Sequence, residues 1–363
     1  MKKILIINCL DIRYGSTHRM RRFFGFLQRE YDVTYMESNY VGGDGRVISV
    51  RQSMTPAGFL LGTLKRLYQT LMTEHDILFV QKFSPFTVPC AVLSKLAGRT
   101  VIIDCDDKDS DFQSSLFRKK VTELFEWIGP RFCDCVLTHN SYLKKDILRI
   151  APGVPVHIVD QGVDTRMFDP SAHDGDGFRG RKFPAGGKVA VYATGFGAGG
   201  TRDLDMVIQA FFLAKKKLPS MHLVLIGGGP LLEGYRERYG GEGIEFTGYL
   251  PQDEVAEYIA AADAGLVYMR ENPGNVYRVS LKVLEYLSMM KPVAGRITGL
   301  TKDLWGKYCL TCGDSAEEFS EKILEAMRVK APCGGAREII SRKYDWNIIG
   351  QRLLETVRAA AEL

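Results

Sequence analysis

The feature that most constrains the fold is an alternation of short apolar runs with longer amphipathic segments, repeated twice along the 363 residues. Such runs, bounded by charged or turn-forming residues, are typical of buried strands. The first set of predicted strands comprises Ile4–Ile7, Val33–Met36, Ile77–Val80, Val101–Ile103, Val136–Thr138 and Val156–Val159. The second comprises Val189–Ala193, Leu223–Ile226, Ile244–Phe246, Ala264–Tyr268, Pro292–Ala294 and Tyr308–Thr311. Strand–helix alternation predicts parallel sheets covered by helices on both faces.

The two sets are separated by Asp169–Lys188, a segment with many glycines and prolines and little apolar periodicity. Its composition predicts a linker. We therefore expect an α/β protein with two doubly wound, Rossmann-like domains, 1–168 and 189–343, which face each other across a central cleft. The tail 344–363 is expected to form a helix that packs back toward the N-terminal domain. Ligands of such sheets bind at the carboxyl ends of the strands.

Composition excludes several classes of protein. A net charge of +5 is too small to indicate a nucleic-acid-binding protein. No apolar stretch is long enough to predict a membrane span. The N-terminal run Ile4–Ile7 is expected to be a strand rather than a signal peptide, because Asn8 and Asp11 follow it. The 8 cysteines are scattered, which favours reduced thiols in a cytoplasmic protein.

A glycine-rich turn, Gly227-Gly228-Gly229, follows the predicted strand Leu223–Ile226. Glycines at a strand-to-helix turn allow backbone amides to approach a phosphate or a ribose closely. A tight turn can need glycine without any ligand, so local physics leaves both interpretations open.

The segment Ser280–Leu287 carries a cation and a carboxylate three residues apart, Lys282 and Glu285, near the start of a predicted helix. Such a pair can serve a sugar nucleotide, because the ammonium attracts phosphates and the carboxylate accepts hydrogen bonds from ribose hydroxyls. The alternative is a solvated salt bridge on the helix surface.

A second glycine-rich loop runs from Gly195 to Gly200 and ends in Arg202 and Asp203, between a predicted strand and a predicted helix. A loop of this kind can wrap an anionic group, with the guanidinium as a charge clamp. The alternative is a flexible loop in which Arg202 pairs with Asp203 or with solvent.

Together these segments resemble the retaining glycosyltransferases of family 4, which have the GT-B fold. The resemblance covers nearly the whole chain and rests on segments in a fixed order. They are Asp11–Ser16, Asp160–Asp164, Gly195…Asp205, Ile226–Pro230, Phe246–Gly248 and Ser280–Leu287 with Lys291-Pro292-Val293. The resemblance implies a nucleotide-diphospho-sugar donor held chiefly by the C-terminal domain.

The resemblance also assigns roles to residues. Glu285 matches the acid that binds ribose hydroxyls, and Arg202, with Lys282, matches the cations that bind the diphosphate. Tyr249 and Leu250 match the segment that contacts the base, and Gly15 and Ser16 would approach the donor from the other domain. The remaining expected donor-binding positions are Gly195, Gly227, Gly228, Gly229, Tyr277, Ser280 and Leu281.

The chain departs from the family pattern at several positions. The first acid of the family's Glu-x7-Glu motif is replaced by Tyr277, and the usual Gly-Arg of the phosphate loop reads Gly195-Phe196. In the N-terminal domain a loop that often carries histidine reads Asp104-Cys105-Asp106-Asp107. Asp106 or Asp107 could bind sugar hydroxyls or orient the acceptor, so both join Arg202 and Glu285 as candidate catalytic residues. A carboxylate-rich turn without a ligand is the alternative.

The implied chemistry is transfer with retention, by attack of the acceptor on the leaving-group face, without an essential metal or other cofactor. Basic side chains and helix N-termini can stabilise the departing diphosphate. The acceptor would be a glycan, a lipid-linked precursor or a small molecule. Two alternatives stay open: a nucleotide-sugar epimerase of the same fold, and a non-catalytic sugar-nucleotide-binding protein.

Three basic segments of the N-terminal domain are interleaved with apolar residues: Arg19–Phe24, Phe59–Tyr68 with Lys65 and Arg66, and Arg118–Lys120. Faces of this kind can dock on an anionic membrane surface. Ordinary helices with one buried and one solvated face are the alternative. The expected location is cytoplasmic, with peripheral contact at the inner face of the membrane as one hypothesis.

Overall fold

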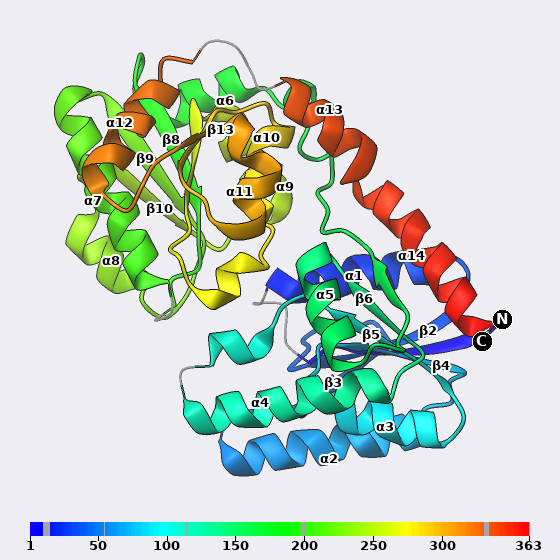
Figure 1. The fold of residues 1–363 in the computed structure, drawn as a ribbon. Coiled ribbons are helices and arrows are strands. Elements are labelled where there is room, and N and C mark those ends of the chain that lie inside the picture. The colour runs from blue at the N-terminus through cyan, green and yellow to red at the C-terminus, as the bar shows by residue number, and fades with distance from the viewer. Residues whose placement is uncertain (10–14, 54, 114, 198–199, 330–333, 363) are drawn as a thin grey trace. The chain divides into compact units, whose positions relative to one another are not determined.

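The computed structural model describes residues 1–9, 15–53, 55–113, 115–197, 200–329 and 334–362 (Figure 1). The chain divides into two compact units. The first contains residues 1–161 and 346–363, and the second contains residues 162–345. Within the described residues, no helix is both long and apolar enough to cross a bilayer.

The first unit is built on a parallel sheet of seven strands in the order β3-β2-β1-β4-β5-β6-β7. Ile4 pairs with Val33 on one side and with Ile77 on the other, so β1 is an interior strand of the sheet. An apolar run such as that of β1 suits this place, because helices bury both faces. The strands are β1 (Lys3–Ile7), β2 (Asp32–Ser38), β3 (Val47–Val50), β4 (Ile77–Gln81), β5 (Thr100–Cys105), β6 (Cys135–Thr138) and β7 (Val156–Ile158).

The helices of the first unit divide between the two faces of this sheet. The step from β1 to β2 runs in the opposite direction to the steps from β3 through β7, so right-handed crossovers place the connecting helices on opposite faces. One core joins Ile4 and Ile6 to α1 (Gly15–Leu27) and α14 (Trp346–Ala361). The other core joins Leu5 and Ile7 to α2 (Pro56–Met72), α3 (Val88–Leu96), α4 (Leu116–Ile128) and α5 (Ser141–Ile150).

The second unit contains a parallel sheet of six strands in the order β10-β9-β8-β11-β12-β13. Its strands are β8 (Lys188–Ala193), β9 (Met221–Ile226), β10 (Ile244–Gly248), β11 (Ala264–Tyr268), β12 (Val293–Arg296) and β13 (Cys309–Thr311). Two apolar cores cover its faces. The larger helices are α7 (Thr201–Lys217), α8 (Leu232–Tyr239), α9 (Gln252–Ala261), α10 (Leu281–Ser288), α11 (Gly299–Trp305), α12 (Ala316–Ala326) and α13 (Gly334–Lys343).

The structure differs from the sequence-based expectation in the segment 169–188. This segment is part of the second unit rather than a linker, and it forms the turn η3 (Pro170–Ala172) and the helix α6 (Gly175–Lys182). The ring of Phe178 packs edge-on against Tyr258 of α9, with centroids 5.0 Å apart. Arg179 forms an ion pair with Asp263 at 2.8 Å. These two contacts fix a segment whose glycine content alone indicates a linker.

A close contact at Gly265 positions α10 on the sheet. A Cβ atom at Gly265 would lie 2.2 Å from the ring of Tyr286, which follows Glu285 on α10. The Tyr286 hydroxyl accepts a hydrogen bond from the backbone N–H of Ala193, at 3.1 Å, at the end of β8. Glycine in β11 therefore allows the tyrosine to lie flat against the sheet and to tie α10 to β8.

We expect Gly265→Ala to destabilise the protein by about 1–3 kcal/mol, because the added methyl group must displace a fully buried ring. Thermal and urea unfolding measure the change. Gly234→Ala in the exposed helix α8 is the control, since no atom lies within 4 Å of its added Cβ. It should raise stability by up to about 1 kcal/mol. Equal stability of Gly265→Ala and the wild type would contradict the proposed packing.

Candidate active site

The order of strands in the second unit creates a natural ligand-binding edge. The chain leaves β8 toward β9 on one side and leaves β11 toward β12 on the other, so the connections diverge between β8 and β11. Ligands of open α/β sheets bind at such a point, beside the carboxyl ends of the strands. Here α7 begins with Arg202 and Asp203 in its first turn. Arg270 follows β11, and its Nε lies 3.5 Å from Oδ1 of Asp203.

Lys282 and Glu285 lie on α10 beside this edge and are both half-buried. The Lys282 ammonium lies over the ring of Tyr192 from β8, 4.2 Å from its centroid. Within the described part of the chain, neither charge has an ion pair or hydrogen-bond partner, including the other. The salt bridge that the spacing left as an alternative is therefore not formed.

The electrostatics of this pair follow from burial without a partner. Burial raises the pKa of Glu285 to about 7, although Lys282 acts to lower it. Burial lowers the pKa of Lys282 to about 8, and Arg278 lowers it further, against Asp203 and Glu285. Charged groups that are desolvated but not neutralised are typical of ligand-binding and catalytic sites.

The surroundings of Asp203 are strongly cationic. Burial raises the pKa of this carboxyl, while four nearby cations act to lower it: Arg270, Lys282, Arg278 and Arg202. One carboxylate among four cations leaves an excess of positive charge, which suits a diphosphate. Sequence analysis singled out Arg202 and Lys282 but missed Arg270 and Arg278. Their placement at either end of the loop between β11 and α10 could have indicated them.

The packing of the turn at the end of β9 requires glycine. Gly227 has φ 139° and Gly229 has φ 151°, a region that side chains disfavour. A Cβ at Gly227 would lie 1.7 Å from the carbonyl oxygen of Thr194, and one at Gly229 would lie 2.5 Å from that of Phe196. The turn therefore packs directly on the loop that follows β8. Gly228 accepts a hydrogen bond from the Phe196 N–H at 3.0 Å.

The other expected donor-binding residues of this unit lie on neighbouring loops. Tyr249 follows β10 and is 65% exposed, and a Cβ at Gly228 would lie 3.5 Å from the Tyr249 Cβ. Among the described residues, which omit 198 and 199 of the same loop, nothing lies within 4 Å of a Cβ added at Gly195. Leu250 packs on the core, and Tyr277 follows the turn η4 (Pro273–Val276).

The start of α10 lacks the side-chain cap that a serine at this position can provide. Ser280 occupies the N-cap position, but its side chain makes no capping hydrogen bond. Its backbone N–H donates to Thr301 Oγ1 at 3.1 Å. Leu281, the first residue of the helix, is half-buried. The first turn of α10 is therefore not closed by its own cap side chain.

In the first unit, Gly15 and Ser16 begin α1. Residues 11–14 of the expected glycine-containing loop lie outside the described residues, as do Ala198 and Gly199 of the loop after β8.

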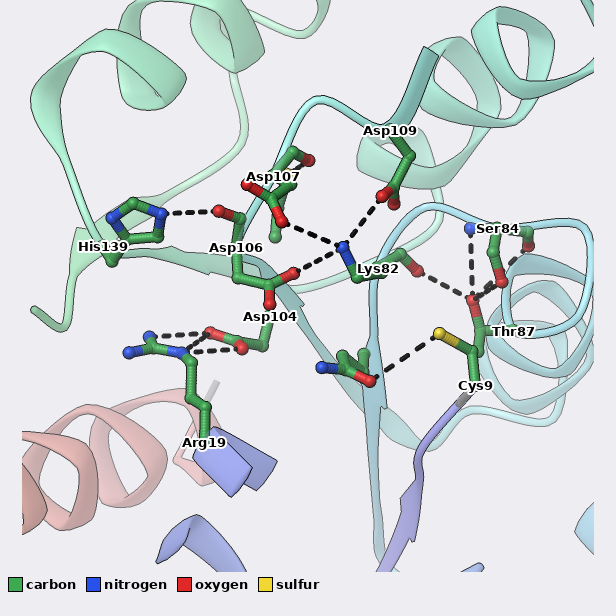
Figure 2. A network of polar contacts seen from close by, with 12 residues as sticks. Cys9, Arg19, Lys82, Ser84, Thr87, Asp104, Asp106, Asp107, Asp109 and His139 are labelled. Atoms are coloured by element: carbon green, nitrogen blue, oxygen red, sulfur yellow. Dashed lines mark hydrogen bonds and ion pairs between the residues drawn. The ribbon is translucent and has the colours of Figure 1, made fainter. Parts of the chain in front are cut away.

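The carboxylates that follow β5 form a charged network with two buried cations (Figure 2). Arg19 of α1 pairs with Asp104 at 3.0 Å, and both side chains are fully buried. Lys82, at the end of β4, contacts three carboxylates, at 3.0 Å, 3.5 Å and 2.8 Å respectively: Asp106, Asp107 and Asp109. His139 Nε2 donates to the carbonyl oxygen of Asp106 at 2.5 Å. Much of this acidic charge is therefore compensated inside the protein.

Asp106 and Asp107 differ in accessibility within this network. The Asp106 side chain is 8% exposed and that of Asp107 is 27% exposed. Burial acts to raise the pKa of Asp106, but Lys82 outweighs it and the pKa is lowered. Burial raises the pKa of Asp109 to about 6 despite the same lysine. Asp107 and Asp109 are thus the carboxylates of this edge most able to meet a ligand.

Lys82 is held in an unusual backbone conformation, with φ 65°. Its N–H donates to the carbonyl oxygen of Asp104 at 2.7 Å, which ties the end of β4 to β5.

Among the described residues, no group of three potential ligands could hold a metal ion. Independence of metal stays a prediction.

Comparisons with known proteins identify the fold and match most of the second unit to a family of glycosyltransferases. Residues 187–333 match the family model described as "Glycosyl transferases group 1". A Bacillus subtilis (strain 168) protein assigned to teichuronic acid biosynthesis as the glycosyltransferase TuaH is 25% identical over 272 residues. The match covers 70% of this chain and 66% of that relative, so the chain spans slightly under two thirds of the relative's length.

Two solved structures share the fold over the whole chain. Sucrose-phosphate synthase of Thermosynechococcus elongatus aligns with a TM-score of 0.75 and 15% identity, over 99% of both chains. Anabaena HepE, solved in complex with UDP, aligns with a TM-score of 0.73 and 18% identity, over 98% of this chain and all of that one. Each unit is Rossmann-like, and the chain has the GT-B fold that the sequence predicted.

The raised pKa of Glu285 makes stability depend on pH. A carboxyl with a pKa near 4.5 in the unfolded chain and about 7 in the folded chain opposes folding increasingly as pH rises through this window. The cost is complete above pH 7. We expect Glu285→Gln to stabilise the protein at pH 8 by up to about 3 kcal/mol, and by progressively less toward pH 4.5.

Urea unfolding between pH 4.5 and 8 measures this effect. Glu321→Gln, at an exposed position of α12, is the matched control and should show no pH-dependent gain. If Glu285→Gln and the wild type were equally stable at every pH, the Glu285 carboxylate would not be desolvated as described.

Proposed function

We propose that the protein transfers a sugar from a nucleotide-diphospho-sugar to an acceptor, with retention of configuration. The match of residues 187–333 to the group 1 glycosyltransferase model supports this proposal. The observation that carries this proposal is that Lys282 and Glu285, at the strand edge of the matched segment, are half-buried and have no ion-pair partner among the described residues. A sugar nucleotide supplies what both groups lack: anionic oxygens for the ammonium and hydroxyl donors for the carboxylate.

The proposed donor site assigns one task to each group. Glu285 accepts hydrogen bonds from the ribose hydroxyls, and Arg202 and Lys282 bind the diphosphate, with Arg270 and Arg278 as further cations. Gly195 and the turn Gly227–Gly229 let the backbone approach the phosphates. Tyr249 and Leu250 contact the base. Tyr277, Ser280 and Leu281 are the other proposed donor-binding positions of the second unit, and a role for Gly15 and Ser16 stays a prediction from the family resemblance.

The proposed mechanism needs no essential metal. As the bond to the diphosphate breaks, negative charge grows on the leaving group, and preorganised cations and helix N-termini stabilise it. The acceptor hydroxyl attacks on the same face, and its proton passes to the departing phosphate. The N-terminal unit binds the acceptor, with Asp106 and Asp107 as hydroxyl-binding or orienting groups.

The proposed acceptor is a glycan or lipid-linked precursor of a cell-envelope polysaccharide. The relative assigned to teichuronic acid biosynthesis supports this choice. The proposed location is cytoplasmic. In its support, all the cysteines among the described residues are free, as expected in a reducing compartment.

Donor binding is tested by thermal shift and calorimetry with a panel of nucleoside diphosphates and their sugar esters. We expect one base to bind, and Glu285→Ala and Arg202→Ala to weaken that binding about 10- to 100-fold, because each removes charge-assisted hydrogen bonds. Glu321→Ala and Arg342→Ala, at exposed positions of α12 and α13, are the matched controls and should bind as the wild type does. Absence of binding by every nucleotide would contradict the proposal.

Transfer itself is tested with the donor so identified, by following the anomeric signals of donor and product by NMR. We expect the product to keep the donor's configuration and the rate to persist in EDTA. An inverted product or loss of the rate in EDTA would refute the proposed mechanism. Conversion of the donor to another sugar nucleotide without acceptor would replace the transferase by an epimerase.

A further inference from the structure

The outward face of helix α2 is apolar, whereas the outward face of an ordinary surface helix is polar. Between Leu60 and Met72, every exposed residue except Lys65 is apolar or aromatic. These side chains recur three or four positions apart, so they form one stripe along the helix. The stripe consists of Leu60, Leu61, Leu64, Tyr68, Leu71 and Met72, each between 51% and 65% exposed.

The inward side of α2 carries a charged residue where an ordinary surface helix has an apolar one. Arg66 is fully buried, and its guanidinium donates to Ser38 Oγ at 2.5 Å and to the Gly62 carbonyl oxygen at 3.3 Å. It also lies over the ring of Phe86, 5.2 Å from its centroid. The leucines are therefore outside because the inner positions are occupied, and not because the helix lacks a partner.

Helix α4 presents a similar outward stripe. Its exposed residues include Leu116, Phe117, Leu124 and Trp127, between 52% and 80% exposed. Both α2 and α4 pack on the same face of the sheet through Leu67 and Phe125 (Figure 1). Their outer sides therefore point to the same side of the first unit. We call these two stripes together the α2/α4 surface.

The exposed charges of the α2/α4 surface that lack an ion-pair partner among the described residues are positive. Helix α2 contains no acidic residue, and Lys65 lies within its stripe. On α4, Glu126 is buried and accepts hydrogen bonds from Ser110, while Glu123 pairs with Lys120 at 2.7 Å. Within the described residues, Lys65 and Arg118 have no ion-pair partner. The Arg131 guanidinium lies over the Trp127 ring, 4.0 Å from its centroid.

The three basic segments of the first unit do not all contribute to this surface. Arg19 of α1 is buried against Asp104, and Arg21 pairs with Glu37 at 3.0 Å. The stretch Arg19–Phe24, which the sequence offered as a membrane-binding face, is therefore largely committed inside the first unit. Arg66 of α2 is committed in the same way. Of the cations in these three segments, the exposed ones lie on α2 and α4.

We propose that the α2/α4 surface docks on an anionic lipid bilayer. Leucine, phenylalanine, tyrosine and tryptophan side chains enter the boundary between headgroups and acyl chains, and the unpaired cations meet lipid phosphates. Tryptophan and tyrosine beside cations are typical of that boundary. An apolar interface with another protein needs no surplus of unpaired positive charge, whereas an anionic bilayer supplies its counter-charge. This binding does not depend on the transferase activity proposed above.

Flotation with vesicles tests the proposal with the full chain. We expect the protein to float with phosphatidylglycerol/phosphatidylcholine vesicles at low salt and much less with phosphatidylcholine alone. Binding should weaken as salt rises, because screening reduces the attraction to the headgroups. No flotation with anionic vesicles at low salt would overturn the proposal.

Tryptophan fluorescence provides a second readout of the same event. Of the three tryptophans, Trp305 and Trp346 are buried, at 1% and 7% exposed, while Trp127 is 53% exposed. Insertion of α4 should therefore shift the emission to shorter wavelength, and Trp127→Phe should abolish the shift. A shift that persists in Trp127→Phe would place the contact elsewhere and overturn the assignment to α4.

Matched variants separate the surface from general stickiness. We expect Leu64→Ser with Phe117→Ser, and separately Lys65→Glu with Arg118→Glu, to weaken anionic-vesicle binding roughly tenfold or more. The controls are Val41→Ser, a 96% exposed apolar position of the same unit, and Lys216→Glu with Lys217→Glu, which changes net charge equally. These should bind as the wild type does, with circular dichroism confirming the fold of every variant.

Two results would replace the bilayer by another partner. Equal loss of binding in the charge control and in Lys65→Glu with Arg118→Glu would show attraction by net charge alone. Concentration-dependent self-association, abolished by Leu64→Ser with Phe117→Ser and accompanied by no vesicle binding, would assign the surface to a second copy of this chain.

Discussion

Parallel pairing of the strands is the constraint on which the rest of the structure depends. Because every strand of a parallel sheet ends at the same edge, side chains far apart in sequence meet there once the strand order is fixed. In the second unit, the divergence between β8 and β11 brings Arg202 and Asp203 of α7 beside Arg270. In the first unit, the neighbouring ends of β4 and β5 bring Lys82 beside Asp106. Neither group would form without the crossover helices that reverse the chain between strands.

The two strand edges differ in whether their buried charges are paired. In the first unit, Arg19 neutralises Asp104, and Lys82 binds three further carboxylates with a strained backbone that this network holds in place. In the second unit, Lys282 and Glu285 stay desolvated and unpaired, which lowers stability. Proteins tolerate such costs at sites where function requires them. The contrast makes the second unit the stronger candidate for binding a charged ligand, and makes Asp104, which is fully buried against Arg19, part of the fold.

Sequence patterns predicted the architecture well, but they did not predict the electrostatic surroundings of the candidate site residues. All the strands expected from apolar runs are present, because buried parallel strands must be apolar along their length. The short strand β3 (Val47–Val50) was not expected, since an edge strand with partly exposed residues gives little contrast with a loop. Helix α6 escaped prediction because its glycines mask a helix held by tertiary contacts. Lys282 and Glu285 were found from their spacing, but whether they paired with each other depended on burial. Arg270 and Arg278 lie at the two ends of the loop between β11 and α10, and the strand order brings them near Asp203.

Helix α2 shows most clearly why periodicity cannot assign a face. An amphipathic pattern states that apolar residues share one side, but not whether that side meets the sheet. Here the buried Arg66 guanidinium donates to two acceptors and lies over an aromatic ring, which offsets part of the cost of its burial, while its Nε has no hydrogen-bond partner among the described residues. The helix is thereby rotated so that Leu60, Leu64 and Tyr68 point outward. Leaving six large apolar side chains in water has no benefit to the fold of the isolated unit. The rotation is therefore best explained by an external apolar phase, and the cations beside the stripe indicate that this phase has an anionic surface.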